Sequence, residues 1–302
     1  MKPLARLQMA WTLITIILVI IGMYLGDILG LEGYIIPLLL ITVMIALYGV
    51  IYSSSDKIIL HRFHSKPIED KNSEISKTVR ELSKALDIPT PKVYTSDLSM
   101  PNLLVVGKRA EHASIVMTGP IQELLGKEEL RAAFAYGMSH IKNEDTLIST
   151  IVAMVCGSIT ALATIAMWAS IFIGFGQEDD PGPMLVKFFV MSIVAPPVAL
   201  IIQLTSEESR ILKADERAAQ ILSDPQRLSS ALKKLQAELM SSNYHVNPSY
   251  VHLFIVSPLK DNFSRLIGLD LPTYNLLFRT HPRIEKRVRR LKFAGGERIE
   301  TD

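Results

Sequence analysis

The sequence predicts an α+β protein with four transmembrane helices in two hairpins and a cytoplasmic part that is mostly helical and carries a small sheet. The 302-residue chain is 49% hydrophobic and only 21% charged, which is too apolar for an ordinary soluble protein. The apolar excess is concentrated in four long runs. The polar segments between and after these runs combine helical periodicity with short strand-like runs, which predicts a mixed domain.

The four apolar runs form two pairs, and each run is about long enough to cross a hydrocarbon core of roughly 30 Å. They span Trp11–Leu25, Ile35–Ile51, Ile148–Phe175 and Met184–Leu204. We therefore predict one transmembrane hairpin over residues 1–52 and a second over residues 146–204. A buried core helix is the alternative for the fourth run, because it contains Lys187 near one end and Pro196-Pro197 within it.

The distribution of charge predicts how the chain lies in a membrane. Basic residues flank both hairpins on the outside and the two connections are acidic, so both termini and both polar segments are expected in the cytoplasm. The single cysteine, Cys156, can form no intramolecular disulfide, which agrees with a reducing compartment. A net charge of +2 argues against a nucleic-acid partner. We expect a multi-pass protein of the cell membrane whose first partner is the lipid bilayer.

The first polar segment, residues 53–145, should begin the cytoplasmic domain. Apolar residues recur at helical spacing from Ile75 to Leu86, which predicts an amphipathic helix that ends before Pro89. A second helix opens at Lys127 and continues through His140 almost directly into the third apolar run. Three short strands are expected between these helices, at Lys92–Thr95, Leu103–Val106 and Ala113–Thr118.

The second polar segment, residues 205–302, reads as helical throughout. One helix begins near Ser206, another covers Pro225 to Leu239, and a charged helix follows Thr280. Neither polar segment can bury a full core alone. We therefore expect residues 53–145 and 205–302 to form one cytoplasmic domain, with the second hairpin inserted in its middle.

The stretch Tyr136-Gly137-Met138-Ser139-His140 lies where a metalloprotease carries His-Glu-x-x-His. Positions 136 and 140 lie one helical turn apart on one face, which is how two imidazoles reach one zinc ion, and position 137 supplies the general base. Only His140 remains in this chain. A phenol such as that of Tyr136 must lose its proton to bind zinc well, and Gly137 has no side chain to accept one.

The order and spacing of several short motifs around the paired hairpins resemble the HtpX-type integral-membrane zinc metalloproteases over nearly the whole chain. The motifs are Ser55-Asp56-Lys57, Pro101-Asn102 with Gly107, Thr118-Gly119, Ser139-His140-Ile141-Lys142-Asn143 with Asp145, Ser209-Arg210 with Ala214-Asp215, and Thr280-His281-Pro282. The resemblance implies a gluzincin-like fold, in which a small sheet lies over the active-site helix and a later helix brings the third zinc ligand.

The resemblance also implies a role for each matching position. The two zinc histidines fall on Tyr136 and His140, the general-base glutamate on Gly137, and the third ligand, a glutamate, on Ile211. Two of the three ligands and the base are therefore absent. The family expects zinc, but we predict that this chain binds none and has no other cofactor. The positions that match and would support the site are Asn143, Asp145, Arg210 and Asp215.

We therefore expect a catalytically inactive HtpX-like pseudoprotease that binds a polypeptide or a membrane-protein partner, in membrane-protein quality control or regulation. Proteases of this type hold substrate as an added strand, and the predicted edge is the strand containing Ser114, Ile115, Val116 and Met117. Two alternatives stay open, an active zinc metalloendopeptidase with a remodelled site and a structural subunit of a membrane assembly. The sequence leaves the oligomeric state open.

Overall fold

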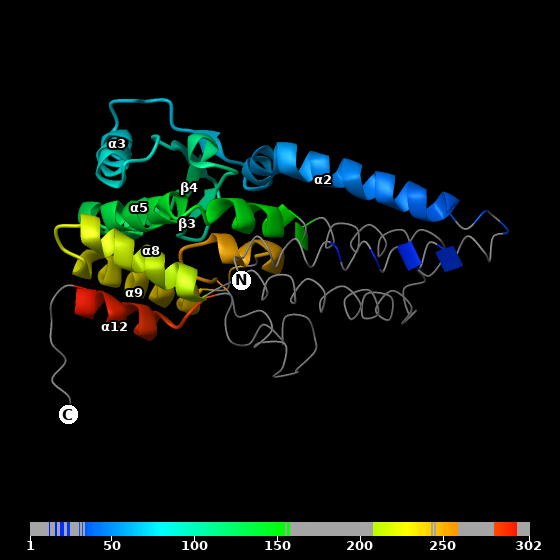
Figure 1. Cartoon of the computed structure of the whole chain (residues 1–302). Coiled ribbons are helices and arrows are strands. Elements are labelled where there is room, and N and C mark those ends of the chain that lie inside the picture. The colour runs from blue at the N-terminus through cyan, green and yellow to red at the C-terminus, as the bar shows by residue number, and fades with distance from the viewer. Residues whose placement is uncertain are drawn as a thin grey trace, which may run out of the picture. The chain divides into compact units, whose positions relative to one another are not determined.

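The computed structural model describes residues 34–154, 156–157, 208–242, 244, 246–258 and 281–294, and isolated positions before residue 34 (Figure 1). Contacts between Cα atoms divide the chain into two units, Met1–Ser55 and Asp56–Asp302. The described part of the second unit is mostly helical and carries one small sheet, so the predicted α+β class is confirmed at that level.

The prediction of four membrane spans is not confirmed. Helix α2 covers Ile35–Arg62 and includes the second apolar run. Within the described ranges, however, no helix meets the combined length and hydropathy expected of a bilayer-crossing helix. The fourth run and most of the first and third lie outside those ranges.

The sheet has four strands in the order β1-β2-β4-β3. Its strands are β1 (Lys66–Pro67), β2 (Lys92–Ser96), β3 (Leu103–Val106) and β4 (Ser114–Thr118). β4 runs parallel to β2 and antiparallel to β3, with Val116 opposite both Tyr94 and Leu104. The chain therefore crosses over between β2 and β4 and places β3 at one edge of the sheet.

The predicted peptide-binding edge is wrong. Ser114, Ile115, Val116 and Met117 belong to β4, which is bonded to a neighbouring strand on each side and offers no free backbone edge. All five β4 residues are buried. Burial on both faces is typical of an interior strand, whereas an edge strand usually carries exposed polar residues.

Helix α5 (Lys127–Lys142) is the centre of the helical part, and the segment Ala132–Gly137 is fully buried. Small residues in this segment allow the helix to approach β3 on one side and α8 and α9 on the other. Glu129 of α5 accepts hydrogen bonds from Ser230 (2.6 Å) and Lys234 (2.7 Å) of α9. The other long helices of the unit are α3 (Glu74–Leu86), α8 (Glu208–Ile221), α9 (Gln226–Ser241) and α12 (Ile284–Ala294).

These contacts join the two polar segments into one packed body. In Figure 1, α8 and α9 (yellow) lie between α5 (green) and α12 (red), and α12 contacts both α8 and α9. The short elements are α4 (Ile121–Leu124), η1 (Ala110–His112) and η2 (Pro248–Leu253). The domain boundaries predicted from the sequence stay predictions.

Gly107 ends β3 with a backbone φ of 149°, and a Cβ atom there would lie 2.7 Å from the Cα of Ala113. Only glycine fits this approach, which brings the chain leaving β3 close to the start of β4. The Gly107 N–H donates to Thr150 Oγ1 at 3.0 Å. This end of β3 is therefore fixed by the chain that follows α5.

Candidate functional site

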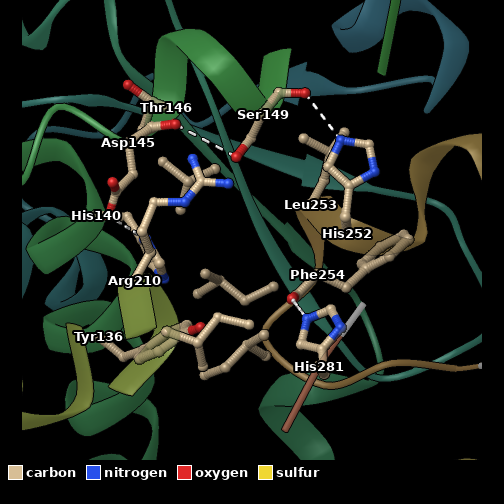
Figure 2. Close-up of a pocket in the computed structure, with 14 residues that line it drawn as sticks. Tyr136, His140, Asp145, Thr146, Ser149, Arg210, His252, Leu253, Phe254 and His281 are labelled. Carbon is tan, nitrogen blue, oxygen red and sulfur yellow. Dashed lines mark hydrogen bonds and ion pairs between the residues drawn. The ribbon is translucent and has the colours of Figure 1, made fainter. Parts of the chain in front are cut away.

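A pocket of about 50 Å³ lies between β3, α5, α8 and the segment that follows η2 (Figure 2). It brings together Tyr136, His140 and Ile211, the three positions that the sequence predicted around a lost zinc ion. Asp145 and Arg210 line it as well. The remaining lining residues are Leu103, Val105, Thr146, Ser149, His252, Leu253, Phe254, Ile255 and His281.

Tyr136 is packed as a core residue, with only 3% of its surface exposed. Its ring meets the edge of the His140 ring, with centroids 4.8 Å apart and planes at 83°. The Arg287 guanidinium lies 4.7 Å from the Tyr136 ring centroid, a cation–π geometry. Burial raises the pKa of the Tyr136 phenol above its ordinary value, so the group stays protonated and is a poor metal ligand.

Arg287 and Asp215 form a wholly buried ion pair beneath Tyr136. Arg287 Nε donates to Asp215 Oδ2 and Nη2 donates to Oδ1, both at 2.8 Å. The third nitrogen, Nη1, donates to the Ile255 carbonyl oxygen at 2.7 Å. This bidentate pair satisfies the carboxylate, and Asp215 therefore supports the structure around the pocket.

Gly137 faces β3 with no space for a larger residue. A Cβ atom there would lie 2.9 Å from Val105 Cγ2 and 3.0 Å from Leu103 Cδ2. Real Cβ atoms essentially never lie under 3.0 Å from another atom, so a glutamate at this position requires the Val105 side chain to move. Close packing of β3 on α5 therefore accompanies the glycine at position 137.

His140 retains the orientation that a metal-binding histidine has. Its Nδ1 lies 3.1 Å from Asp145 Oδ2. In metal-binding histidines one ring nitrogen bonds to such a carboxylate and the other, here Nε2, is the one that would face a metal. Arg210 and Ile211 reach the same pocket from α8. Asn143 follows α5 as its C-terminal cap, and its N–H donates to the Ser139 carbonyl at 2.9 Å.

The side chains present do not fit a catalytic zinc ion. Such a zinc takes three protein ligands and leaves one position for water. Here His140 is the single imidazole at the expected place, Tyr136 is a buried neutral phenol, and Ile211 is apolar. In the part of the chain that the structure describes, no three His, Cys, Asp or Glu side chains are grouped to hold a metal.

Two further histidines complete the pocket wall. His252 Nε2 lies 2.9 Å from the Ser149 carbonyl oxygen and His281 Nε2 lies 2.7 Å from that of Phe254, so each Nε2 donates its proton. Burial lowers the pKa of His252 to about 4 and that of His281 to about 3, so both rings are neutral at pH 7.

Sequence reasoning missed several of these roles. Arg287 lies in a charged stretch that predicts a solvated helix, and nothing in that stretch distinguishes it from its neighbours. Leu103 and Val105 were expected only as strand residues. His281 was marked by the Thr280-His281-Pro282 motif, although its bond to a backbone carbonyl was not foreseen.

A small mixed sheet packs on the central helix α5, and His140 of α5 and Ile211 of α8 meet in one pocket. The sequence model of peptidase family M48 matches residues 69–294, so the chain belongs to this family. The predicted HtpX-type membership is confirmed by relatives described as protease HtpX homologues.

Three of these relatives show how far the similarity extends. The homologue of Desulfatibacillum aliphaticivorans is 35% identical over 288 residues, which covers 95% of this chain and 88% of that protein. The Aquifex aeolicus homologue is 36% identical over 245 residues, which cover 80% of this chain and 78% of that protein. The Pyrococcus furiosus homologue is 34% identical and covers 89% of each. The crystal structure of S. mikatae Ste24p has a TM-score of 0.48 at 17% identity, covering 95% of this chain and 65% of that one.

Proposed function

We propose that this chain is an HtpX-like member of family M48 that does not hydrolyse peptide bonds and instead binds a polypeptide or a membrane-protein partner. The observation that carries the proposal is the packing of Gly137 on β3, where Val105 Cγ2 lies 2.9 Å from the Cβ position. Glycine supplies no general base, and a larger residue at this position would have to displace the Val105 side chain. Loss of such a base typically reduces the rate about 10²- to 10⁴-fold.

The metal position supports the same conclusion. Tyr136 is held between His140 and Arg287, and its neutral phenol occupies the place of a zinc ligand. Ile211 adds an apolar wall at the place of another. One imidazole cannot hold a zinc ion in a geometry that activates water.

A membrane location is part of the proposal and is supported by the sequence. The apolar runs and the basic residues that flank them favour a multi-pass protein of the cell membrane with a cytoplasmic domain. On α2, the side chains of Leu38, Leu39 and Ile45 are 62%, 60% and 69% exposed. Exposed apolar side chains in such a row suit a lipid environment better than water.

Polypeptide binding is supported by the edge of the sheet. The outer side of β3 already bonds to another segment of the same chain, because Leu104 and Phe254 form an isolated bridge and the Ile255 N–H donates to the Leu103 carbonyl oxygen at 2.8 Å. An edge whose backbone groups accept one segment has the chemistry to accept another, since main-chain hydrogen bonds supply the affinity. The proposed partner is therefore an extended or unfolded polypeptide.

The alternative is an active metallopeptidase, and two observations favour it. The relatives are described as proteases, and His140 keeps its bond to Asp145. Elemental analysis of the purified full-length protein in detergent, followed by incubation with unfolded casein, separates the two functions. The proposal expects much less than one zinc per chain, intact casein and measurable casein binding. Stoichiometric zinc with chelator-sensitive cleavage would establish the alternative.

A further inference from the structure

The outer edge of β3 is covered by residues Leu253–Val256, here called the resident strand; Leu253 is the last residue of η2, and Phe254 forms a single isolated bridge to β3. Leu104 pairs with Phe254 in an antiparallel bridge, and the Ile255 N–H bonds to the Leu103 carbonyl at 2.8 Å. Asn102 Nδ2 donates to the Val256 carbonyl oxygen at 2.8 Å. The resident strand therefore lies where an added polypeptide strand would pair with the sheet.

The resident strand is also held from its other side. Arg287 Nη1 donates to the Ile255 carbonyl oxygen and His281 Nε2 donates to that of Phe254, both at 2.7 Å. The Phe254 ring meets Phe63 edge-on, with centroids 5.7 Å apart. All four side chains of the strand are at most 6% exposed. Three of them line the pocket, so the same strand covers the former metal site.

The opposite edge of the sheet offers no comparable surface. β1 there has only two residues, and Pro67 has no N–H to donate. Lys66 is exposed and paired with Asp97 at 2.9 Å. Short edge strands with proline and lysine are typical of edges protected against strand addition. A polypeptide that joins this sheet as an extra strand must therefore use β3.

We propose that the resident strand is an internal strap that closes the polypeptide-binding edge, and that an extended apolar segment binds by replacing it. This inference rests on the proposed function and specifies the ligand. The chemistry of the ligand follows from the strap itself, whose sequence is Leu-Phe-Ile-Val. An intramolecular competitor has an effective concentration of about millimolar, so a free peptide binds the intact protein weakly.

The first test weakens the strap and leaves β3 unchanged. The probe is a fluorescent synthetic peptide with the sequence of residues 251–258, added to the full-length protein in detergent. Ile255→Pro removes the N–H that bonds to Leu103, and we expect its peptide affinity to exceed that of the wild type by about ten-fold or more. Ile255→Val is the matched control, because it keeps the N–H, and it should bind like the wild type. Equal affinity for all three proteins would overturn the inference.

The second test locks the strap in place. Leu104→Cys and Phe254→Cys are combined in a Cys156→Ser background, because bridged residues lie within the usual range for a disulfide. We expect the oxidised protein to lose peptide binding and the same protein to regain it after reduction. The reduced form is the control for folding, since both forms have one sequence. Equal binding by the two forms, or no binding by either, would overturn the inference.

Casein distinguishes a failure of this inference from a failure of the proposed function. Casein binding that is equal in the oxidised and reduced forms would place the binding site elsewhere, so that the proposed function stands and the strap is excluded. Casein cleavage by the wild type would instead reject the proposed function. The hydrogen-exchange rate of the Ile255 amide is an independent measurement in the wild type. A peptide that replaces the strap breaks the bond from this amide to Leu103 and must raise the rate. Unchanged exchange at saturating peptide would contradict the strap.

Discussion

The Arg287 guanidinium lies 4.7 Å from the centre of the Tyr136 ring, and Tyr136 lines the pocket that His140 and Ile211 share. Its charge is balanced by Asp215, through two hydrogen bonds of 2.8 Å. A buried cation, its carboxylate and an aromatic ring thus form a structural cluster beside the pocket. The stability of the domain should depend on this cluster.

Asp215→Ala is expected to destabilise the protein strongly. It leaves the wholly buried Arg287 without its counter-charge, a change that typically costs about 3–5 kcal/mol. Glu216→Ala is the matched control on the same helix. It removes the partner of Arg290 at 3.1 Å, but both side chains are 48% exposed, so it should cost under about 1 kcal/mol. Thermal unfolding measures both, and similar losses for the two variants would contradict the buried-pair account.

Gly137→Ala should destabilise the domain, although alanine is the better helix former. The added methyl group contacts Val105 Cγ2 at 2.9 Å, and overpacking of this kind typically costs about 1–3 kcal/mol. The same substitution in a Val105→Ala background should cost markedly less, because the nearer of the two obstructing groups, the Val105 Cγ2 methyl, is gone. Denaturant unfolding of the four proteins in this cycle gives the coupling between the two positions. If the two substitutions changed the free energy of unfolding additively, the contact between positions 137 and 105 would carry no cost.

Restoring the family's residues should require more than the metal ligands and the base. We expect the triple variant Tyr136→His, Gly137→Glu and Ile211→Glu to bind little zinc, because β3 occupies the space of the glutamate. Adding Leu103→Ala and Val105→Ala opens that space, and this variant should approach one zinc per chain. Elemental analysis and casein cleavage are the measurements. Equal zinc content in the two variants would show that the β3 side chains do not obstruct the site.

Acid should destabilise the protein through its neutral histidines. The pKa of His252 is lowered to about 4, whereas an unfolded chain titrates near 6.5. Between these values the unfolded state binds a proton that the folded state does not bind, so stability falls as pH falls, by up to about 1.4 kcal/mol per pH unit for this group. His252→Gln should show a shallower slope of unfolding free energy between pH 6.5 and 4. The control His112→Gln removes an exposed histidine, and a slope change as large as that of His252→Gln would contradict the assignment.

The local elements of this fold could be predicted from the sequence. The expected strands at Leu103–Val106 and Ala113–Thr118 match β3 and β4 within one residue, and the helix that opens at Lys127 is α5. Apolar spacing and breaker residues decide such elements locally. Strand order is decided by contacts between distant segments. The strand expected at the edge was therefore found in the interior, bonded to β2 and β3.

The candidate site also divides into residues that the local sequence predicts and contacts between distant segments that it does not. The sequence identified Tyr136, His140 and Ile211, and the structure brings these three positions to one pocket. It did not reveal that Arg287 is buried, because a charged helix and a buried ion pair have the same local pattern. The contact of Val105 with Gly137 was also hidden, since it joins a strand and a helix that are separated in the sequence by η1, β4 and α4.

The packing of Gly137 also makes a glutamate difficult to introduce at position 137 by a single substitution. A glutamate introduced first meets Val105 and Leu103, and smaller β3 residues introduced first leave a cavity beside the glycine. Either order passes through a less stable protein. Gly137, Val105 and Leu103 therefore behave as one coupled unit, in which a change at one position is tolerated only together with changes at the others.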